Sequence, residues 1–532
     1  MDNNRTILAV VLIVLLWSGY SLFFSPQQAI QNDSINELKS DNSVVTKDEN
    51  IVRKSEPTEV TEPVVSVVNI GEEKLINIET NYYNLVLTTK GATIHSFSLN
   101  NYKESNSENS DYYNLLKSIE KDSLSTTGSD GIYLPNNIIY NLVTDKTDYK
   151  VSNERTTVSF IADTNELTVI KNYIFNPSDY TFDLEVQLIN KSSKILSGNL
   201  NLSLFTPWDE DNKSELYTFV GPITYDGQDL HEDKPDDLVN SPKIYQNDIT
   251  WSGFTTKYFA MLVSPKDTPG QLFITNDADY IENKFITDNI ELDTNKKITL
   301  NYSVYFGPKQ YEYLQASNNR FEEIIHYGFF HPLAKPLIVV LKFFYNFTGN
   351  YGFSIILLTI CIKIIFWPLT QKSYKSMKGM QKLQPEMKRL REKYGSDKQK
   401  LNQEMMSFYK EHKVNPLGGC LPMLIQIPVF FALYRVLLGS IELRHAPFML
   451  WITDLSAKDP YYVTPLIMGV TMFLQQKMTP TNMDPTQEKI MLMMPVIFTF
   501  MFLNFPSGLV IYWLINNLLT ILQQYLIRRQ PD

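Results

Sequence analysis

The residue best suited to chemistry in this sequence is a lysine inside an apolar segment. Lys363 lies in the stretch LLTICIKIIFWPL, more than one helical turn from either end of that segment. A charge at the centre of a bilayer costs at least about 2.5–3.5 kcal/mol, so this ammonium group must face water or a polar partner. The simpler alternative is a lysine whose aliphatic stem reaches back to the membrane surface, but the central position favours a functional role.

The apolar segments offer Lys363 neutral polar neighbours and no obvious carboxylate. Thr359 shares a helix face with Lys363 because the two residues are four apart, and Asn516 shares another face with Tyr512 and Gln523. This pattern predicts a hydrated cavity that holds one unpaired positive charge, whereas a pump or symporter would show acidic or histidine relays. For any single amide, an interhelical hydrogen bond is the more common role. The neutral polar residues concerned are Thr359, Gln426, Asn516, Asn517, Gln523 and Gln524.

Six apolar segments are predicted to cross a membrane. The first covers residues 7–24; Arg5 precedes it and no small-residue cleavage site follows, which indicates a retained anchor. The other five lie in the last third of the chain, and the middle one is short and is expected to extend at both ends. Arg435 lies near the outer end of its segment, where a snorkelling side chain is the better account. The five segments cover residues 351–369, 420–438, 465–475, 490–505 and 509–527.

Charge predicts how these segments are oriented. Residues 372–413 carry twelve Lys or Arg residues against five acids, which places this loop in the cytoplasm. Arg528 and Arg529 close the chain on the same side. Six spans then put both termini in the cytoplasm and the large central region on the other side of the membrane, so we expect a multi-pass membrane protein. The net charge of −10 argues against a nucleic-acid-binding surface over the whole molecule.

The central region, residues 66–325, shows the two-residue period of β-strands. Apolar and polar residues alternate over 182–188, 200–204 and 298–306, as expected for strands with one buried and one wet face. Turn residues at 176–179 separate such runs. A large antiparallel sandwich is the best interpretation.

Composition sets the other expected boundaries. Residues 26–65 are rich in Ser, Asn, Asp, Glu and Pro without any period, which is typical of a flexible linker. Residues 332–347 are apolar but contain Lys335 and Lys342, which favours an amphipathic helix on the membrane surface. The expected order is an anchor over 1–25, the linker over 26–65, the β domain over 66–325, the surface helix over 326–349 and a helical core over 350–532.

The basic loop predicts a cytoplasmic helical hairpin over 372–416. Two apolar stripes recur at helical spacing on either side of a turn at 394–397, which contains a helix-capping residue. Methionine in such stripes suits adaptable apolar contacts, and Pro385 is expected to kink the first helix. The alternative is a self-packed hairpin whose charge merely sets topology. The stripes consist of Met377, Met380, Leu383, Met387 and Leu390, then Leu401, Met405, Phe408 and Tyr409.

The sequence contains no recognisable catalytic or nucleotide-binding motif. The two cysteines, Cys361 and Cys420, lie in apolar segments without a C-x-x-C partner and are interpreted as small buried hydrophobes. His95 and His231 are the clear histidines of the β domain and stand isolated. We therefore expect no enzymatic activity, no cofactor and no metal, and a structural or docking role for the β domain.

The last third of the chain resembles the YidC/Oxa family of membrane protein insertases, in its Gram-negative form. The resemblance covers nearly all of residues 350–527 and implies a β-supersandwich in the extracytosolic domain, similar to sugar-mutarotase folds. A similar fold does not imply mutarotase activity. Among the matching stretches are YGFSIILLTICIK, WPLTQKSYKSMKGMQKLQPEMKRLREKYG, QEMMSFYKEHKVNPLGGCLPMLIQIPVFFALY and FPSGLVIYWLINNLLTILQQ.

The resemblance implies a groove open to the cytoplasm and to lipid and closed toward the periplasm. The family usually has arginine where this chain has Lys363, so the charge is kept but the planar fork is lost. Tyr512 and Trp513 stand where two tyrosines are common. The family's surface for sliding clients lies on the third and fifth spans. The implied sliding residues here are Leu421, Pro422, Pro428, Phe430 and Met501.

These observations together predict an insertase that draws a client into a groove around Lys363. The expected partners are nascent membrane proteins, the ribosome, the Sec translocon and the lipid bilayer, with no specific nucleic-acid sequence. Two alternatives stay open: a transporter or channel that uses Lys363 as an anion site, and a membrane-anchored, sugar-active periplasmic enzyme. The groove is expected to be completed by Thr359, Gln426, Tyr512, Trp513 and Asn516.

Overall fold

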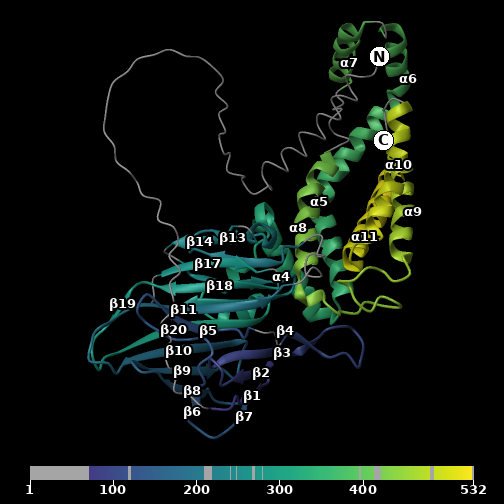
Figure 1. Cartoon of the computed structure of the whole chain (residues 1–532). Coiled ribbons are helices and arrows are strands. Elements are labelled where there is room, and N and C mark those ends of the chain that lie inside the picture. The colour runs from purple at the N-terminus through teal and green to yellow at the C-terminus, as the bar shows by residue number, and fades with distance from the viewer. Residues whose placement is uncertain are drawn as a thin grey trace, which may run out of the picture. The chain divides into compact units, whose positions relative to one another are not determined.

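The computed structural model describes the chain from residue 71 to residue 529, with several gaps (Figure 1). The predicted anchor over 7–24 and linker over 26–65 lie outside the described residues. Val65–Asp532 forms one compact unit, in which a sheet-rich part, called the β domain, precedes a helical core. The gaps are residues 118–120, 209–217, 240, 247–248, 267–269, 278, 395–396, 413–420 and 480–484.

The β domain contains three sheets, and every pairing between its described strands is antiparallel except that of β1 with β7. The first sheet orders its strands as β4 (Tyr112–Leu116), β3 (Thr93–Lys103), β2 (Tyr83–Thr88), β1 (Leu75–Thr80) and β7 (Asp148–Val151). The second orders them as β13 (Leu230–Glu232), β12 (Gly221–Tyr225), β15 (Trp251–Thr255), β16 (Phe259–Pro265), β20 (Lys297–Pro308), β10 (Thr181–Asn190), β9 (Leu167–Phe175), β8 (Thr156–Asp163) and β6 (Asn141–Leu142). The third orders them as β14 (Lys243–Gln246), β17 (Gly270–Asn276), β18 (Tyr280–Thr287), β11 (Leu196–Pro207) and β19 (Ile290–Leu292), with β5 (Ser125–Ser129) also paired to β11.

The alternation found in the sequence is confirmed in the strands that build the core of the β domain. In β10 every second residue is buried, because successive side chains point to opposite faces of a strand. This strand lies between β9 and β20, with Leu184 opposite Tyr302. The rings of Phe306 on β20 and Phe97 on β3 lie 5.3 Å apart. The first and second sheets therefore share one hydrophobic core.

Helices occur at the predicted surface helix and at each of the five predicted apolar segments after it. The short helix α2 (Pro235–Leu238) lies within the β domain. The elements after the last strand are α3 (Tyr311–Ala316), η2 (Phe321–Ile324), η3 (Gly328–Phe330), α4 (His331–Thr348), α5 (Tyr351–Lys382), α6 (Gln384–Tyr394), α7 (Lys398–Glu411), α8 (Leu421–Gly439), η5 (Ile441–Leu443), α9 (Val463–Met478), α10 (Pro485–Phe502) and α11 (Ser507–Arg529).

The basic loop differs from its prediction at one point. Helix α5 does not end near residue 369 but continues to Lys382, and a turn at Leu383 separates it from the next helix. Proline lacks an N–H group and restricts the residue before it, so Pro385 lies in the first turn of the new helix α6, which begins at Gln384, instead of kinking an existing helix. Asp397 caps α7 as predicted, since its Oδ1 accepts hydrogen bonds from the backbone N–H groups at the start of that helix.

The helical core has a hydrophobic centre of its own. Helix α11 packs against α5 and α9, and α4 packs against α5 and α8 (Figure 1). Close approach between helices depends on small residues. A Cβ atom at Gly469 of α9 would lie 2.1 Å from Oγ1 of Thr499 on α10, so only glycine permits this contact.

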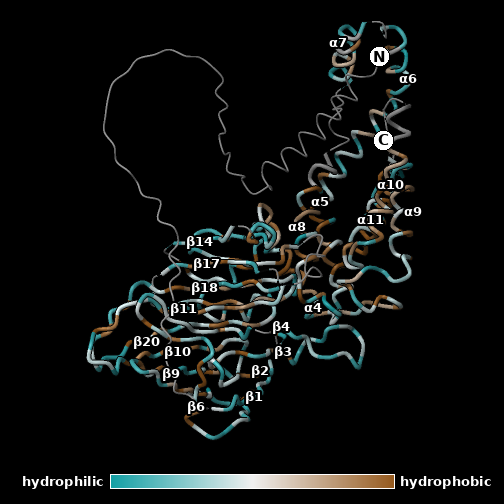
Figure 2. The backbone as a smooth tube through the Cα atoms, viewed as in Figure 1, coloured by the Kyte–Doolittle hydropathy of each residue, from teal (hydrophilic) through white to brown (hydrophobic). Residues whose placement is uncertain are grey.

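Apolar residues also cover the outside of these helices (Figure 2). Ile365 on α5, Val470 on α9, Phe500 on α10 and Leu522 on α11 are all exposed. Large exposed apolar faces mark a surface that is covered by another apolar medium. Among the described residues, α5 and α11 are long and apolar enough to cross a membrane, and shorter apolar helical stretches occur at Gln426–Gly439 and Met491–Phe502. The count of six spans therefore stays a prediction.

Candidate functional site

The strongest candidate site is a line of polar contacts between α5 and α11, called the α5–α11 seam. Lys363 of α5 donates from Nζ to Oγ1 of Thr520 at 2.6 Å and to Oδ1 of Asn516 at 3.3 Å. Nearer the end of α11, Gln523 donates from Nε2 to Oγ1 of Thr370 at 2.8 Å. Thr520 lies four residues after Asn516, so both reach α5 from one face of α11.

The charge of Lys363 is not balanced by any acid among the described residues. Lys363 is only 9% exposed. Its ammonium group donates to a hydroxyl oxygen and an amide oxygen, and both of these groups are neutral. Neutral acceptors solvate an ammonium group but leave its field uncompensated, and that field is strong where the dielectric constant is low. The arrangement can therefore attract a negatively charged or strongly polar group.

Other amides of α11 hold helices together, as expected for single amides in apolar segments. Asn517 donates from Nδ2 to Oγ1 of Thr471 on α9 at 3.3 Å. Gln524 donates from Nε2 to Oγ1 of Thr479 at 3.1 Å. These hydrogen bonds join α11 to α9 and its C-cap residue, and those of the seam join α11 to α5. Helix α11 is therefore hydrogen-bonded to a neighbour on each of two faces.

The structure brings together only some of the residues predicted to line a groove. Asn516 contacts Lys363, as described, and Gln426 of α8 shares a side-chain hydrogen bond with Tyr512. Thr359 does not bind Lys363; its hydroxyl donates to the carbonyl of Ile355 in its own helix, at 2.6 Å. A threonine inside a helix can satisfy its hydroxyl in this way, so sharing a face with Lys363 was not enough to make contact.

Of the residues implied as a client-sliding surface, three have described side chains, and two of these are exposed. Pro428 of α8 is exposed, and Met501 of α10 is 45% exposed. Phe430 is half-buried and packs edge-on against Trp513, with ring centroids 4.7 Å apart. Trp513 also contacts Phe498 and Phe502, so it anchors an aromatic cluster that joins α8, α10 and α11. Leu421 and Pro422 belong to α8, but their side chains lie outside the described residues.

Sequence reasoning missed Thr520, which makes the shortest contact of Lys363. The available signal was its spacing, since a hydroxyl four residues after Asn516 must share that residue's helix face. Threonine is common in helix interfaces and its hydroxyl is often satisfied by its own backbone. Thr520 lies in such an interface, where it accepts a hydrogen bond from Lys363, and its own hydroxyl donates to the carbonyl of Asn516 at 2.7 Å.

The basic hairpin formed by α6 and α7 packs part of its methionine stripe inward. Met377 and Met380 lie at the end of α5, and Met387 lies on α6; all three are buried. Met406 on α7 is exposed. Among the described side chains of this hairpin, the surface that remains for a partner consists of charged groups of both signs and Met406.

The histidines of the β domain are not isolated, which corrects the sequence-based expectation. Nδ1 of His95 lies 3.0 Å from Oδ1 of Asp122, and Nε2 of His231 lies 2.7 Å from Oδ2 of Asp226. Desolvation acts to raise the pKa of Asp226, but hydrogen bonds from His231 and from backbone N–H groups outweigh it and bring this pKa to about 2. His95 lies on β3 and His231 on β13, in different sheets, so the two pairs form no shared centre.

Helices with apolar outer faces, a buried charge between two of them and a large β domain are typical of a membrane protein with an extramembrane domain. A family model described as the YidC periplasmic domain matches residues 75–340, and one described as the 60Kd inner membrane protein matches residues 343–532. The chain belongs to the YidC family of membrane protein insertases.

Relatives of similar length carry the same name. The membrane protein insertase YidC of Geotalea daltonii is 41% identical over 99% of both chains. That of Citrifermentans bemidjiense is 46% identical over 86% of both chains, and that of Geobacter sulfurreducens is 42% identical over 99% of this chain and 98% of its own. Insertion is not an enzymatic activity, so these names support the expectation that the chain is not an enzyme.

Solved structures give weaker likenesses. A crystal structure of an active YidC insertase with its first transmembrane domain resolved is 17% identical, with a TM-score of 0.37, over 88% of this chain and 95% of that chain. A galactose mutarotase-like protein from Lactobacillus casei is 13% identical, with a TM-score of 0.32, over 44% of this chain and 100% of its own. Scores this low carry no argument, and the family assignment rests on the sequence comparisons.

Proposed function

We propose that this chain is a membrane protein insertase that receives nascent membrane proteins and releases their transmembrane helices into the inner membrane. Full-length relatives are named for this function. The observation on this chain that carries the proposal is Lys363, a positive charge held between α5 and α11 by neutral oxygens alone. An acidic or polar client tail would supply the missing negative group.

The proposed mechanism is passive. A polar tail of the client enters a hydrated groove beside Lys363, which shortens its path through the low-dielectric layer. Gln426, Tyr512, Trp513 and Asn516 line this groove, whereas Thr359 supports α5 from within. Burial of the client's apolar helix in lipid then supplies the driving force.

The client helix is proposed to leave along α8 and α10. Pro428 and Met501 are exposed there, and the aromatic cluster around Trp513 stiffens the surface between them. Leu421 and Pro422 would extend the same path toward the start of α8. An apolar surface of this kind guides a helix by contact without holding it tightly.

The proposed topology has six spans, both termini in the cytoplasm and the β domain in the periplasm. The α6–α7 hairpin then lies in the cytoplasm, where its positive charge suits ribosomal surfaces and emerging chains. The Sec translocon is the proposed partner for clients with larger extracytosolic parts.

Site-directed crosslinking to a stalled nascent client tests this function. Photoreactive residues at Phe431 of α8 and Phe500 of α10 should crosslink to the client, and one at Val470 of α9 serves as a matched exposed control. Equal crosslinking from all three positions would contradict the proposed path. Anion flux through proteoliposomes without client insertion would instead favour a transporter or channel.

A further inference from the structure

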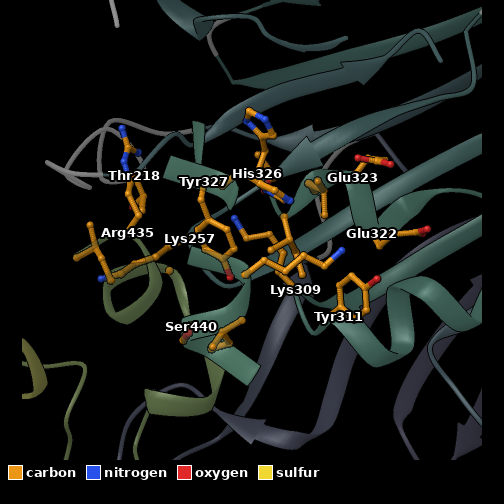
Figure 3. Close-up of a pocket in the computed structure, with 18 of the residues that line it drawn as sticks. Thr218, Lys257, Lys309, Tyr311, Glu322, Glu323, His326, Tyr327, Arg435 and Ser440 are labelled. Atoms are coloured by element: carbon orange, nitrogen blue, oxygen red, sulfur yellow. The ribbon is translucent and has the colours of Figure 1, made fainter. Parts of the chain in front are cut away.

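A cavity of about 310 Å³ lies where the β domain meets α4 and the end of α8 (Figure 3). Lys257 and Lys309 line it from the β domain, Lys335 lines it from α4, and Arg435 and Ser440 line it from the α8 side. Small-molecule pockets usually have volumes of about 300–1,000 Å³, so this one suits a compact polar group. None of its lining residues belongs to the α5–α11 seam or to the predicted sliding residues, although Arg435 lies on the same helix, α8, as Pro428 and Phe430.

The lining of this cavity carries positive and negative side chains in equal number. It carries five basic side chains and five glutamates, but Lys342 is held between Glu312 and Glu442 by ion pairs of 2.8 Å each. That trio has one more acid than base, so the other four basic groups and three acids leave the lining neutral overall. Arg435 forms no ion pair with any described residue. Basic groups gathered in a recess bind phosphate oxygens well. The four basic residues are Lys257, Lys309, Lys335 and Arg435, and the three acids are Glu232, Glu322 and Glu323.

Glu232 provides a negative group next to Arg435. Glu232 lines the cavity, and desolvation raises the pKa of its carboxyl group despite the attraction of Lys309, Arg435 and His326. An ammonium group in the cavity would stabilise the ionised carboxylate. The cavity thus presents complementary groups for a ligand that carries both a phosphate and an amine.

The rim of the cavity opens onto an apolar face of α4. Val339 lines the cavity and is 61% exposed. Phe343 and Phe347 continue this face along the same helix, and Phe347 is 84% exposed. Apolar side chains on one face of an interfacial helix enter the boundary between headgroups and acyl chains. A ligand in the cavity can therefore extend apolar chains along α4.

We propose that this cavity binds the headgroup of a zwitterionic aminophospholipid. The phosphodiester lies against Arg435, Lys257 and Lys309, the primary ammonium group lies against Glu232, and the acyl chains lie along the exposed face of α4. A bound lipid would fix the β domain and α4 to the outer surface of the membrane. This inference goes beyond insertion and does not depend on the client path.

Photolabelling of the full chain tests the proposal. The protein is reconstituted in phosphatidylcholine vesicles that contain a trace of phosphatidylethanolamine with a photoreactive group near its headgroup, and labelled peptides are mapped by mass spectrometry. We expect labelling of peptides that contain residues 331–342 and 435–442. Arg435→Gln should lower this labelling about tenfold, the size expected for loss of one charge-assisted hydrogen bond.

Controls separate this site from general charge and from free anions. Lys458→Gln, at an exposed basic residue of the loop between α8 and α9 and outside the cavity, should leave the labelling unchanged. Glu232→Gln should reduce the preference for phosphatidylethanolamine over an equally labelled phosphatidylglycerol. Unchanged labelling of Arg435→Gln would overturn the proposal. Displacement by inorganic phosphate as effective as that by unlabelled phosphatidylethanolamine would also overturn it, because the site would then be a free-anion site.

Discussion

The β domain and the helical core each bury a lysine that forms no ion pair with a described residue, but they hold it differently. Lys171 of the β domain has no exposed surface, and its Nζ donates to the backbone carbonyls of Gly91 at 3.1 Å and Leu124 at 2.9 Å. Lys363 donates only to side chains, those of Asn516 and Thr520 on another helix.

The difference lies in what must move to release each ammonium group. The carbonyls around Lys171 are fixed by the strands and turns of the sandwich, so they can leave only if that part of the β domain opens. Hydroxyl and amide groups can change rotamer within a folded helix, and water or a client can replace them. Lys171 is therefore a structural element, whereas Lys363 is suited to exchanging partners.

Reversing the charge at Lys363 should have the largest effect on insertion. Lys363→Glu repels an acidic client tail in a low-dielectric site, so insertion of such clients should fall about tenfold or more. Lys363→Ala should have an intermediate effect, and Lys363→Arg should be nearly neutral because the charge is kept. Insertion of one client, with its tail acids present or removed, is measured at matched expression of the three variants.

The client without tail acids is the control for this series. Thr520→Val is a matched variant that removes the closest acceptor and keeps the charge, so its effect should be smaller and independent of the tail. If all variants impaired both client forms equally, Lys363 would serve the folding of the helical core, and its contrast with Lys171 would disappear.

Replacing the α6–α7 hairpin should have the next largest effect. A neutral flexible linker in place of residues 384–411 removes both helices of the hairpin and the exposed Met406, with seven of the twelve basic residues of 372–413 and all five acids. Met377 and Met380 stay in α5. Insertion should fall several-fold because clients are no longer received. The measurement is insertion together with crosslinking to ribosomes, and protease mapping checks that the spans are intact. Normal insertion would reduce the hairpin to a topology signal.

The structural role of Lys171 should appear as a pH dependence of stability instead of a loss of insertion. Burial lowers the pKa of Lys171 from 10.5 to about 7. The folded state therefore binds fewer protons than the unfolded state between about pH 7 and pH 10, and stability should rise with pH in that window, by at most about 1.4 kcal/mol per pH unit. Below about pH 7 the cost of burying the charge is present in full.

Hydrogen exchange of β-domain amides in the full chain measures this dependence. Lys171→Met removes the titrating group and should flatten the rise, whatever its effect on absolute stability. If Lys171→Met kept the full increase of stability with pH, other titrating groups would be its cause. Client insertion at neutral pH should be close to that of the wild type, which separates this lysine from Lys363.

The sequence allowed prediction of features that depend on local spacing. The two-residue period of β10 and the cap at Asp397 follow from neighbours in the chain, and Lys363 stands out because an apolar segment surrounds it. The carboxylate partners of His95 and His231 and the pairing of Lys363 with Thr520 depend on which faces meet in the folded chain. Periodicity shows that a residue is buried, but only packing decides which atom it touches.

The cavity next to α4 shows even more clearly that spacing along the sequence does not predict which residues meet. Glu232 and Arg435 are far apart in the sequence, and Arg435 by itself was interpreted as a snorkelling side chain. Only the meeting of a β-domain edge with the end of α8 turns them into neighbours. No spacing rule relates positions that become neighbours only where two parts of the fold meet.

Deleting the β domain should have the smallest effect on insertion. Its apolar core and that of the helical core are separate, and the seam and sliding residues all lie in the latter. Removing residues 75–308 takes out the strands from β1 to β20 and keeps Glu312, which pairs with Lys342. Ile441 packs into the β-domain core, so Ile441→Ser in the same variant prevents a new exposed apolar patch.

Insertion by this deletion variant should stay within about twofold of the wild type, a change well under 1 kcal/mol. The measurement is insertion of one client at matched abundance, with protease accessibility to confirm that the spans keep their orientation. If clients failed to insert while the protein remained abundant and correctly oriented, the β domain would act directly on clients. The division between a structural β domain and a working helical core, on which the contrast between Lys171 and Lys363 rests, would then be wrong.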